Sequence, residues 1–114
     1  MKLSKVAEIL NASVVCGKEN LSREVTHAFA SDLMSDVLTI DSRNLLLLTG
    51  LTNVQTIRTS EMADIQNIVI VRNKKVTPEM LEIAKENDIV ILECNYSLFR
   101  ACGKLFTAGL EPVY

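Results

Sequence analysis

The sequence predicts an α/β fold, a three-layer sandwich in which a mostly parallel sheet of about four to five strands carries helices on both faces. Three largely apolar runs support this prediction: Leu45–Thr49, Asn67–Val71 and Ile89–Leu92. Such runs are typical of strands buried on both faces of a parallel sheet, because half-exposed strands alternate apolar and polar residues. Helical patterns separate the runs, and this alternation of strand and helix favours right-handed crossovers within one sheet.

The composition predicts one aliphatic core. The chain has 114 residues, of which 48% are hydrophobic and only 4% are aromatic. Because single domains commonly contain about 100–150 residues, we expect one α/β domain that spans residues 1–114. The aliphatic bias favours close packing of helices against a sheet.

Charge and hydropathy argue against several classes of function. Twelve basic and fourteen acidic side chains give a formal charge of −2 without blocks of one sign, so no nucleic-acid partner is predicted. The N-terminal residues contain charges that a signal-peptide core does not tolerate, and no run reaches the about 20 apolar residues of a membrane span. Cys16, Cys94 and Cys102 lack metal-ligand spacing, which indicates reduced thiols in a cytoplasmic protein.

The first forty residues predict two short helices and two strands. Ser4 is a suitable cap for a helix that stops near Asn11, and a β-branched strand follows at residues 13–16. A second strand is expected at Val25–Ala30. Ser31 and Asp32 would cap the next helix, whose apolar side chains share one face: Leu33, Met34, Val37 and Leu38.

A helix is expected after each of the three apolar runs. The first, at about Asn53–Met62, is only weakly amphipathic. The second begins at Thr77-Pro78-Glu79, which supplies a cap, a proline at the first helical position and an acid in the first turn. The third begins near Ser97 and stops at Gly109. Its predicted apolar face consists of Leu98, Phe99, Cys102, Leu105 and Phe106.

Three separated segments resemble the small stand-alone DRTGG-domain proteins of bacteria and archaea. They are Ala30–Leu38, Leu48–Asn53, and Cys102–Phe106 with Gly109-Leu110, and they occur in the family's order; the pentapeptide that names the family is absent. The resemblance implies a three-layer domain similar to the N-terminal domain of HPr kinase/phosphorylase. It also implies a regulatory or assembly unit, of the kind found beside nucleotide-sensing CBS domains or enzyme domains, and it implies no catalytic residues.

Polar residues follow three of the predicted strands, at Ser31-Asp32, Thr49–Asn53 and Glu93–Ser97. In open parallel sheets, ligands bind beyond the carboxyl ends of the strands, where helix N-termini present free N–H groups. We therefore expect a small polar or anionic metabolite, or a nucleotide, to bind there. The candidate residues are Ser31, Asp32, Thr49, Gly50, Asn53 and Asn95. The other interpretation is that these residues are only helix caps and a turn.

No cofactor and no metal are predicted, because the chain has neither a GxxxxGK[ST] phosphate loop nor a GxGxxG motif. Cys94 supports an alternative function, a thiol-based enzyme or redox sensor, since a neighbouring helix N-terminus would lower its pKa. His27, the only histidine, is interpreted as structural. A catalytic role would require it to lie beside an acid such as Asp32 or Asp36.

The C-terminal tail predicts self-association. Leu110, Val113 and Tyr114 are apolar, and either they or the helix at 53–62 could form the interface of a homodimer. A tail that folds back on its own core is the alternative. Taken with the lack of catalytic spacings, these features favour a nonenzymatic regulatory or assembly module whose protein partner is encoded elsewhere.

Overall fold

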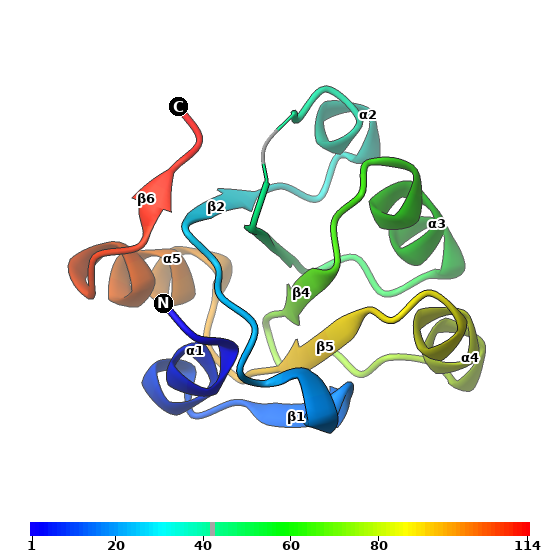
Figure 1. Cartoon of the computed structure of the whole chain (residues 1–114), viewed down its shortest axis with the longest axis horizontal. Coiled ribbons are helices and arrows are strands. Elements are labelled where there is room, and N and C mark those ends of the chain that lie inside the picture. Colours follow the sequence, from blue (N-terminus) through cyan, green and yellow to red (C-terminus); the bar gives the residue numbers. More distant parts are fainter. Residues whose placement is uncertain (42) are drawn as a thin grey trace.

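A computed structural model describes residues 1–41 and 43–114, and in this part of the chain a six-stranded sheet carries helices on both faces (Figure 1). The predicted fold class is confirmed, although the sheet has six strands rather than four to five. The strands are β1 (Ser13–Cys16), β2 (His27–Ala30), β3 (Leu45–Thr49), β4 (Asn67–Ile70), β5 (Val90–Glu93) and β6 (Glu111–Pro112).

The helices are all short. They are α1 (Leu3–Leu10), the 3₁₀ turn η1 (Lys18–Asn20), α2 (Met34–Val37), α3 (Val54–Met62), α4 (Pro78–Glu86) and α5 (Leu98–Thr107). Within residues 1–41 and 43–114, none of them combines the length and the hydrophobicity that crossing a membrane requires.

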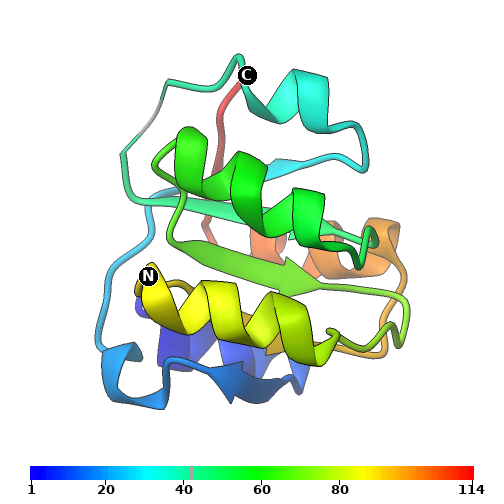
Figure 2. The ribbon, with the colours of Figure 1, turned by 90° about the vertical axis from the view of Figure 1, so that its right-hand side faces the viewer.

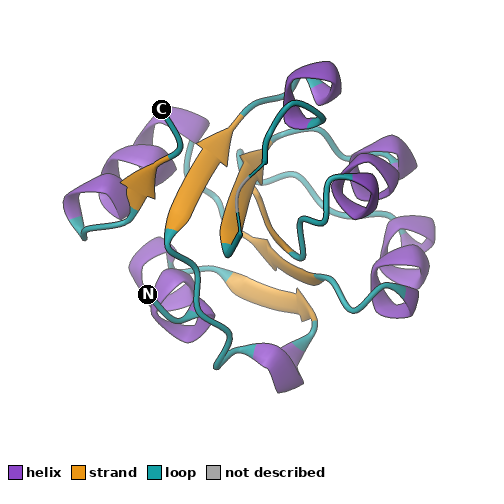
Figure 3. Cartoon of the chain, turned by 45° about the horizontal axis from the view of Figure 1, so that its top comes forward, coloured by secondary structure: helices purple, strands orange, loops and turns teal. Residues whose placement is uncertain are grey.

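The strand order is β1-β5-β4-β3-β2-β6, and only β1 runs antiparallel to its neighbour. Because β2, β3, β4 and β5 are consecutive neighbours, right-handed connections place α2, α3 and α4 on the same face, onto which Figure 2 looks. From β5, α5 crosses the other face and brings β6 to the far side of β2. Helices therefore flank the strands on both sides (Figure 3).

The leucines of β3 form the centre of both cores. Leu46 and Leu48 pack with α1 and α5, whereas Leu45 and Leu47 pack with α2, α3 and α4. Successive side chains of a strand point to opposite faces, so a run of leucines serves both layers. This confirms that the apolar run is a strand buried on two faces.

Three of the predicted N-caps are confirmed. Asn53 Oδ1 accepts a hydrogen bond from the N–H of Thr56 at 3.0 Å. Thr77 caps α4 with Pro78 at its start, and Ser97 caps α5. These caps were predictable because a cap acts on a backbone group only three residues away.

The predicted cap at Ser4 is wrong. The first helix begins at Leu3, its N-cap is Lys2, and no side chain caps it. The N–H groups of Leu3 and Ser4 instead donate to the carbonyls of Arg23 and Leu21, each at 3.0 Å. A distant segment therefore satisfies the helix start, which no local pattern reveals.

The predicted caps and apolar face of α2 are also wrong. This helix spans only four residues, and its N-cap is Leu33 rather than Ser31 or Asp32. So short a helix cannot bury a wide face: Val37 is buried, but Leu33 and Leu38 are exposed.

The apolar face predicted for α5 needs correction as well. Ala101 and Leu105 are buried, whereas Phe99 and Phe106 are exposed. The two phenylalanines lie seven residues apart and share a side of the helix, but that side is turned away from the buried one. The helix therefore has two apolar stripes, and only one is fully buried against the sheet.

The C-terminal tail folds back on the domain, as the alternative interpretation proposed. Leu110 is buried and Val113 packs against the core beneath α2 and α3. Between them, β6 pairs with β2 in parallel. Tyr114 remains largely exposed, with its ring edge against Phe29 at a centroid distance of 6.4 Å.

Candidate ligand site at the carboxyl edge of the sheet

The parallel pairing of β2, β3, β4 and β5 places their carboxyl ends at one side of the sheet, which we call the carboxyl edge. The three predicted junctions all lie there. The strand β4 separates β3 from β5, so the junction containing Asn95 lies about 10 Å from that containing Gly50. The end of β4, between the two, was not among the predicted junctions.

Asp32 links the ends of β2 and β3. Its Oδ1 accepts hydrogen bonds from the Gly50 N–H at 2.7 Å and the Thr49 hydroxyl at 2.9 Å. Thr49 is fully buried, and its Oγ1 also accepts from the N–H of Leu51 at 3.2 Å. Thr49 therefore holds the turn in place and does not face solvent.

Ser31 makes only local contacts. Its N–H donates to the carbonyl of Leu48 at 3.1 Å and continues the pairing of β2 with β3. Its hydroxyl oxygen accepts from the N–H of Leu33 at 3.0 Å. This arrangement is a turn of the kind that serine commonly forms.

The start of α3 presents unused hydrogen-bond donors. Thr56 is capped by Asn53, but among the described residues the N–H groups of residues 52–55 have no acceptor. Such free N–H groups carry partial positive charge at a helix start and favour an anion.

Arg72 lies against Gly50. A Cβ atom placed on Gly50 would be 2.9 Å from Nε and 3.1 Å from Nη2 of Arg72. The group that approaches the Gly50 backbone is therefore this guanidinium. In the described part of the chain, no carboxylate forms an ion pair with Arg72. A guanidinium without a partner is a ready ligand for phosphate or carboxylate.

A tight turn after β4 positions Arg72. Arg72 and Asn73 both have left-handed backbones, with φ of 63° and 59°, and the N–H of Lys74 returns to the carbonyl of Val71 at 3.4 Å. These are the features of a type I′ turn. Such a conformation costs about 1 kcal/mol or more for each residue that is not glycine.

The turn is fastened to the loop after β5. The N–H groups of Arg72 and Asn73 donate to the carbonyls of Tyr96 at 2.8 Å and Cys94 at 3.0 Å. The buried carboxylate of Glu93 accepts from the N–H of Val76 at 2.8 Å. Backbone bonds and the Glu93 carboxylate therefore hold the turn without using the Arg72 side chain.

Sequence reasoning did not select Arg72 as a candidate residue. The signal was available, because Arg72 directly follows the apolar run at 67–71, just as Asp32 and Gly50 follow theirs. Ligands bind beyond the carboxyl ends of parallel strands, and this rule applies equally to the ends of β2, β3, β4 and β5.

The structure does not place His27 beside Asp32, and it does not lower the pKa of Cys94. Burial raises the pKa of the Cys94 thiol, and a hydrogen bond from the Tyr96 backbone lowers it by less, so the expected lowering is reversed. His27 begins β2 whereas Asp32 follows it, which separates them by about 16 Å of extended chain. In the described ranges, no three His, Cys, Asp or Glu side chains are grouped to hold a metal ion.

Comparison with known proteins supports the fold. No family model and no curated protein matches the chain. A solved structure that resembles it contains the CBS and DRTGG domains of the regulatory region of Clostridium perfringens pyrophosphatase, in complex with the activator diadenosine tetraphosphate. The TM-score is 0.76 over 96% of this chain, with 14% sequence identity, and the match spans 47% of the other chain. The likeness shows a DRTGG-like fold for this chain.

Proposed function

We propose that this protein is a nonenzymatic regulatory module, a single DRTGG-like domain that binds a small anionic metabolite at the carboxyl edge of its sheet. The observation that carries the proposal is the position of Arg72, whose guanidinium lies against Gly50 without a carboxylate partner in the described residues. The free N–H groups of residues 52–55 lie at the end of the adjacent strand.

The residues of the site divide into two groups. Arg72 and the N–H groups at the start of α3 contact the anion, and the side-chain amides of Asn53 and Asn95 add neutral hydrogen bonds. Asp32, Thr49, Gly50 and Ser31 shape the turns that hold these groups. The site therefore recognises a phosphate or carboxylate, with amide donors on both sides of it.

A nucleotide is the class of metabolite that we favour. The structure with the same fold comes from a regulatory region and was determined with a nucleotide activator, diadenosine tetraphosphate. A nucleotide supplies the anionic phosphates that Arg72 would contact. The module then transmits nucleotide binding to a protein encoded elsewhere.

A thermal-shift panel tests the ligand. It compares diadenosine tetraphosphate, ATP, AMP and inorganic pyrophosphate with adenosine, which lacks phosphate. A ligand present at 100 times its Kd adds about 2.7 kcal/mol to the free energy of unfolding. We expect at least one phosphate compound to raise the melting temperature and adenosine to leave it unchanged. Absence of a shift with every compound would refute the proposal.

Two substitutions test the position of the ligand. Arg72→Gln removes the guanidinium charge, and Gly50→Ala places a methyl group 2.9 Å from Nε of Arg72, so the guanidinium has to shift. Both should weaken binding by about tenfold or more, because a hydrogen bond to a charged group contributes about 1.5–3 kcal/mol. The matched control is Lys18→Gln, which removes an exposed cation next to β1, at the opposite end of the parallel strands.

Assembly is the second half of the proposal: the module is a homodimer. Closed twofold dimers are the commonest form of soluble oligomer, and this chain exposes several large apolar side chains. Sedimentation equilibrium at high micromolar concentration measures this directly, and a monomer at that concentration would refute it. The ligand half of the proposal does not depend on the result.

A further inference from the structure

The exposed side of α5 carries an apolar stripe that the domain itself covers only at Cys102, which is partly buried against the core. It consists of Phe99, Cys102, Gly103 and Phe106, and both phenylalanines are largely exposed. In Figure 1, α5 lies at the left margin of the molecule, with β6 beside it. The positions i, i+3, i+4 and i+7 describe one helical side, so these residues form a continuous surface.

An apolar cavity lies next to this stripe. Its volume is about 270 Å³, and its walls come from β2, from the tail at 110–114, and from Cys102, Leu105 and Phe106 of α5. The largely exposed Phe106 forms part of its wall. An engineered apolar cavity of about 150 Å³ binds benzene, so this volume accommodates a phenyl ring.

We propose that a second copy of this chain covers the stripe, with the two α5 helices antiparallel around a twofold axis between Cys102 and Gly103. In this arrangement the Phe99 ring of each copy enters the cavity of its partner, beside Phe106. The inference rests on the assembly half of the proposed function and is independent of the ligand half.

The sequence of the stripe is self-complementary. Phe99 and Phe106 lie at equal distances along the helix from the midpoint of Cys102 and Gly103. A twofold axis at that midpoint therefore brings Phe99 of each copy opposite Phe106 of the other. This is the isologous contact that a closed dimer requires, and it leaves no unmatched stripe at which a third copy could bind.

The centre of the stripe allows close helix contact. A Cβ atom at Gly103 would meet nothing within 4 Å, so the helix surface is hollow at the proposed axis. The nearby cations do not obstruct this approach. The guanidinium carbon of Arg100 lies 4.1 Å from the centre of the Tyr96 ring, and Lys104 Nζ lies 5.5 Å from it, both on the other flank of α5.

The exposed aromatic area supplies most of what a small dimer interface needs. The side chains of Phe99, Phe106 and Tyr114 are 90%, 67% and 86% exposed. At about 200 Å² for each aromatic residue, they present about 500 Å² per copy, or about 1,000 Å² for two copies. Specific interfaces bury about 1,200–2,000 Å² in total, so the flanking residues need to add only a small part.

Sedimentation equilibrium of the full chain and of two variants tests the interface. Phe99→Glu places a charge on the stripe, and the matched control, Met62→Glu, places one on an exposed apolar side chain of α3. We expect the wild type and Met62→Glu to be dimers. Phe99→Glu should raise the dimer dissociation constant by about thirtyfold or more, because a buried central aromatic residue is a typical hot spot. Since Phe99 is exposed within one copy, circular dichroism should show unchanged folding.

Disulfide crosslinking tests the orientation of the helices. In Gly103→Cys, the introduced thiol lies next to Cys102 of the partner, so mild oxidation should give a covalent dimer at low protein concentration. Met62→Cys is the control and should remain uncrosslinked under the same conditions. A dimer that crosslinks equally in both variants contradicts the antiparallel α5 pair.

The outcomes separate the two levels of the proposal. If the wild type is a dimer and Phe99→Glu remains one, the α5 interface is wrong but the proposed assembly stands. If the wild type is a monomer, both fail. If the wild type is a dimer that Phe99→Glu dissociates and Gly103→Cys crosslinks, the interface is established.

Discussion

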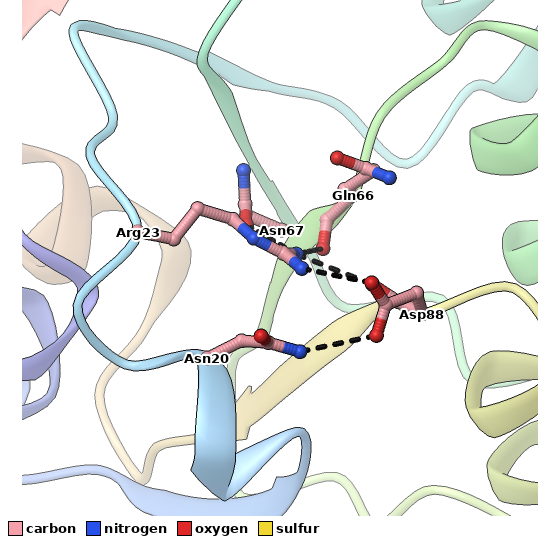
Figure 4. A network of polar contacts seen from close by, with 5 residues as sticks. All are labelled: Asn20, Arg23, Gln66, Asn67 and Asp88. Carbon is pink, nitrogen blue, oxygen red and sulfur yellow. Dashed lines mark hydrogen bonds and ion pairs between the residues drawn. The ribbon is translucent and has the colours of Figure 1, made fainter.

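The two ends of the parallel strands use their arginines in opposite ways. At the amino edge, where the parallel strands begin, Arg23 lies at the centre of a polar network (Figure 4). Its Nη1 donates to the carbonyls of Gln66 and Asp88, each at 3.2 Å, and to Oδ1 of Asn67 at 3.3 Å. Its Nη2 pairs with the Asp88 carboxylate at 3.4 Å, which also accepts from Asn20 at 3.1 Å.

At the carboxyl edge, Arg72 has no comparable network. Its backbone N–H is bonded to Tyr96, but in the described ranges its side chain has no ion pair, and the N–H groups of residues 52–55, beyond the adjacent strand β3, have no acceptor. Arg72 also occupies a strained left-handed conformation. The Arg23 side chain is thus bonded within the fold, whereas the Arg72 side chain has no ion pair among the described residues, and this difference is the basis of the ligand site that we propose at the carboxyl edge.

The largest effect is expected for Arg23→Ala. The change removes several charge-assisted hydrogen bonds and leaves the buried side chain of Asn67 with an unpaired oxygen. We expect the free energy of unfolding to fall by about 2–3 kcal/mol in urea titrations. Lys18→Ala, at an exposed cation of the same edge, should change it by less than about 0.5 kcal/mol. Equal losses in the two variants would show that the network has no structural role.

The second largest loss of stability is expected at Asp32, whose carboxylate holds the turn at the carboxyl edge. Asp32→Ala removes the acceptor of the Gly50 N–H and of the buried Thr49 hydroxyl, and should cost about 2 kcal/mol. Asp32→Asn retains an acceptor oxygen at the same position and should recover most of the loss. If both variants lose the same stability in urea titrations, the charge of Asp32 matters rather than its hydrogen bonds.

The third prediction is a gain in the free energy of unfolding rather than a loss. Arg72→Gly relieves the left-handed strain, so it should raise the free energy of unfolding by about 1 kcal/mol. The same variant should lose the melting-temperature shift caused by the phosphate compound. Arg72→Ala keeps the strain, and should lose the shift without the gain in stability. A loss of stability in Arg72→Gly would show that the Arg72 side chain belongs to the fold.

The smallest expected effect is a pH dependence of stability that arises from one buried cysteine at each edge. Burial raises the pKa of Cys16, the last residue of β1, and of Cys94, which follows β5. The folded state therefore holds these protons more tightly than the unfolded chain, in which a thiol has a pKa of about 8.5. The contribution to stability is complete below that pH and declines as the pH rises above it, by less than about 1 kcal/mol per cysteine up to pH 9.

Urea titrations between pH 7 and pH 9 measure this decline, which should be shallower in Cys16→Ala and in Cys94→Ala than in the wild type. Alkylation rates provide the control, since both thiols should react slowly at neutral pH. Rapid alkylation of Cys94 alone at pH 7 would contradict a raised pKa and would revive the thiol-based alternative.

The parts of the fold that depend on local physics were predictable from the sequence. The apolar runs identified β3, β4 and β5, and Asn53, Thr77 and Ser97 were recognised as caps. The strand β6 was missed because two residues, one of them proline, have no strand pattern and depend on pairing with β2. The two stripes of α5 were predicted as one face because both are apolar. Only the position of the sheet shows which stripe is buried.

The candidate site was predictable only as a location. The expected edge follows from parallel strands, but the contacts within it join residues far apart in the chain. Asp32 and Gly50 are separated by eighteen positions, and Arg72 reaches Gly50 from the next strand. Arg72 and Asn73 adopt left-handed conformations that glycine commonly provides, so their sequence does not indicate the turn that places the guanidinium.

The central claim is that the carboxyl edge binds an anion while the amino edge supports the fold. Backbone amide chemical shifts, recorded by NMR during titration with ATP and with inorganic pyrophosphate, test it most directly. We predict that at least one compound perturbs Gly50, residues 52–55 and Arg72, and leaves Arg23 and Asp88 unchanged. Perturbations centred on Arg23, or no perturbation at either edge, would contradict the account.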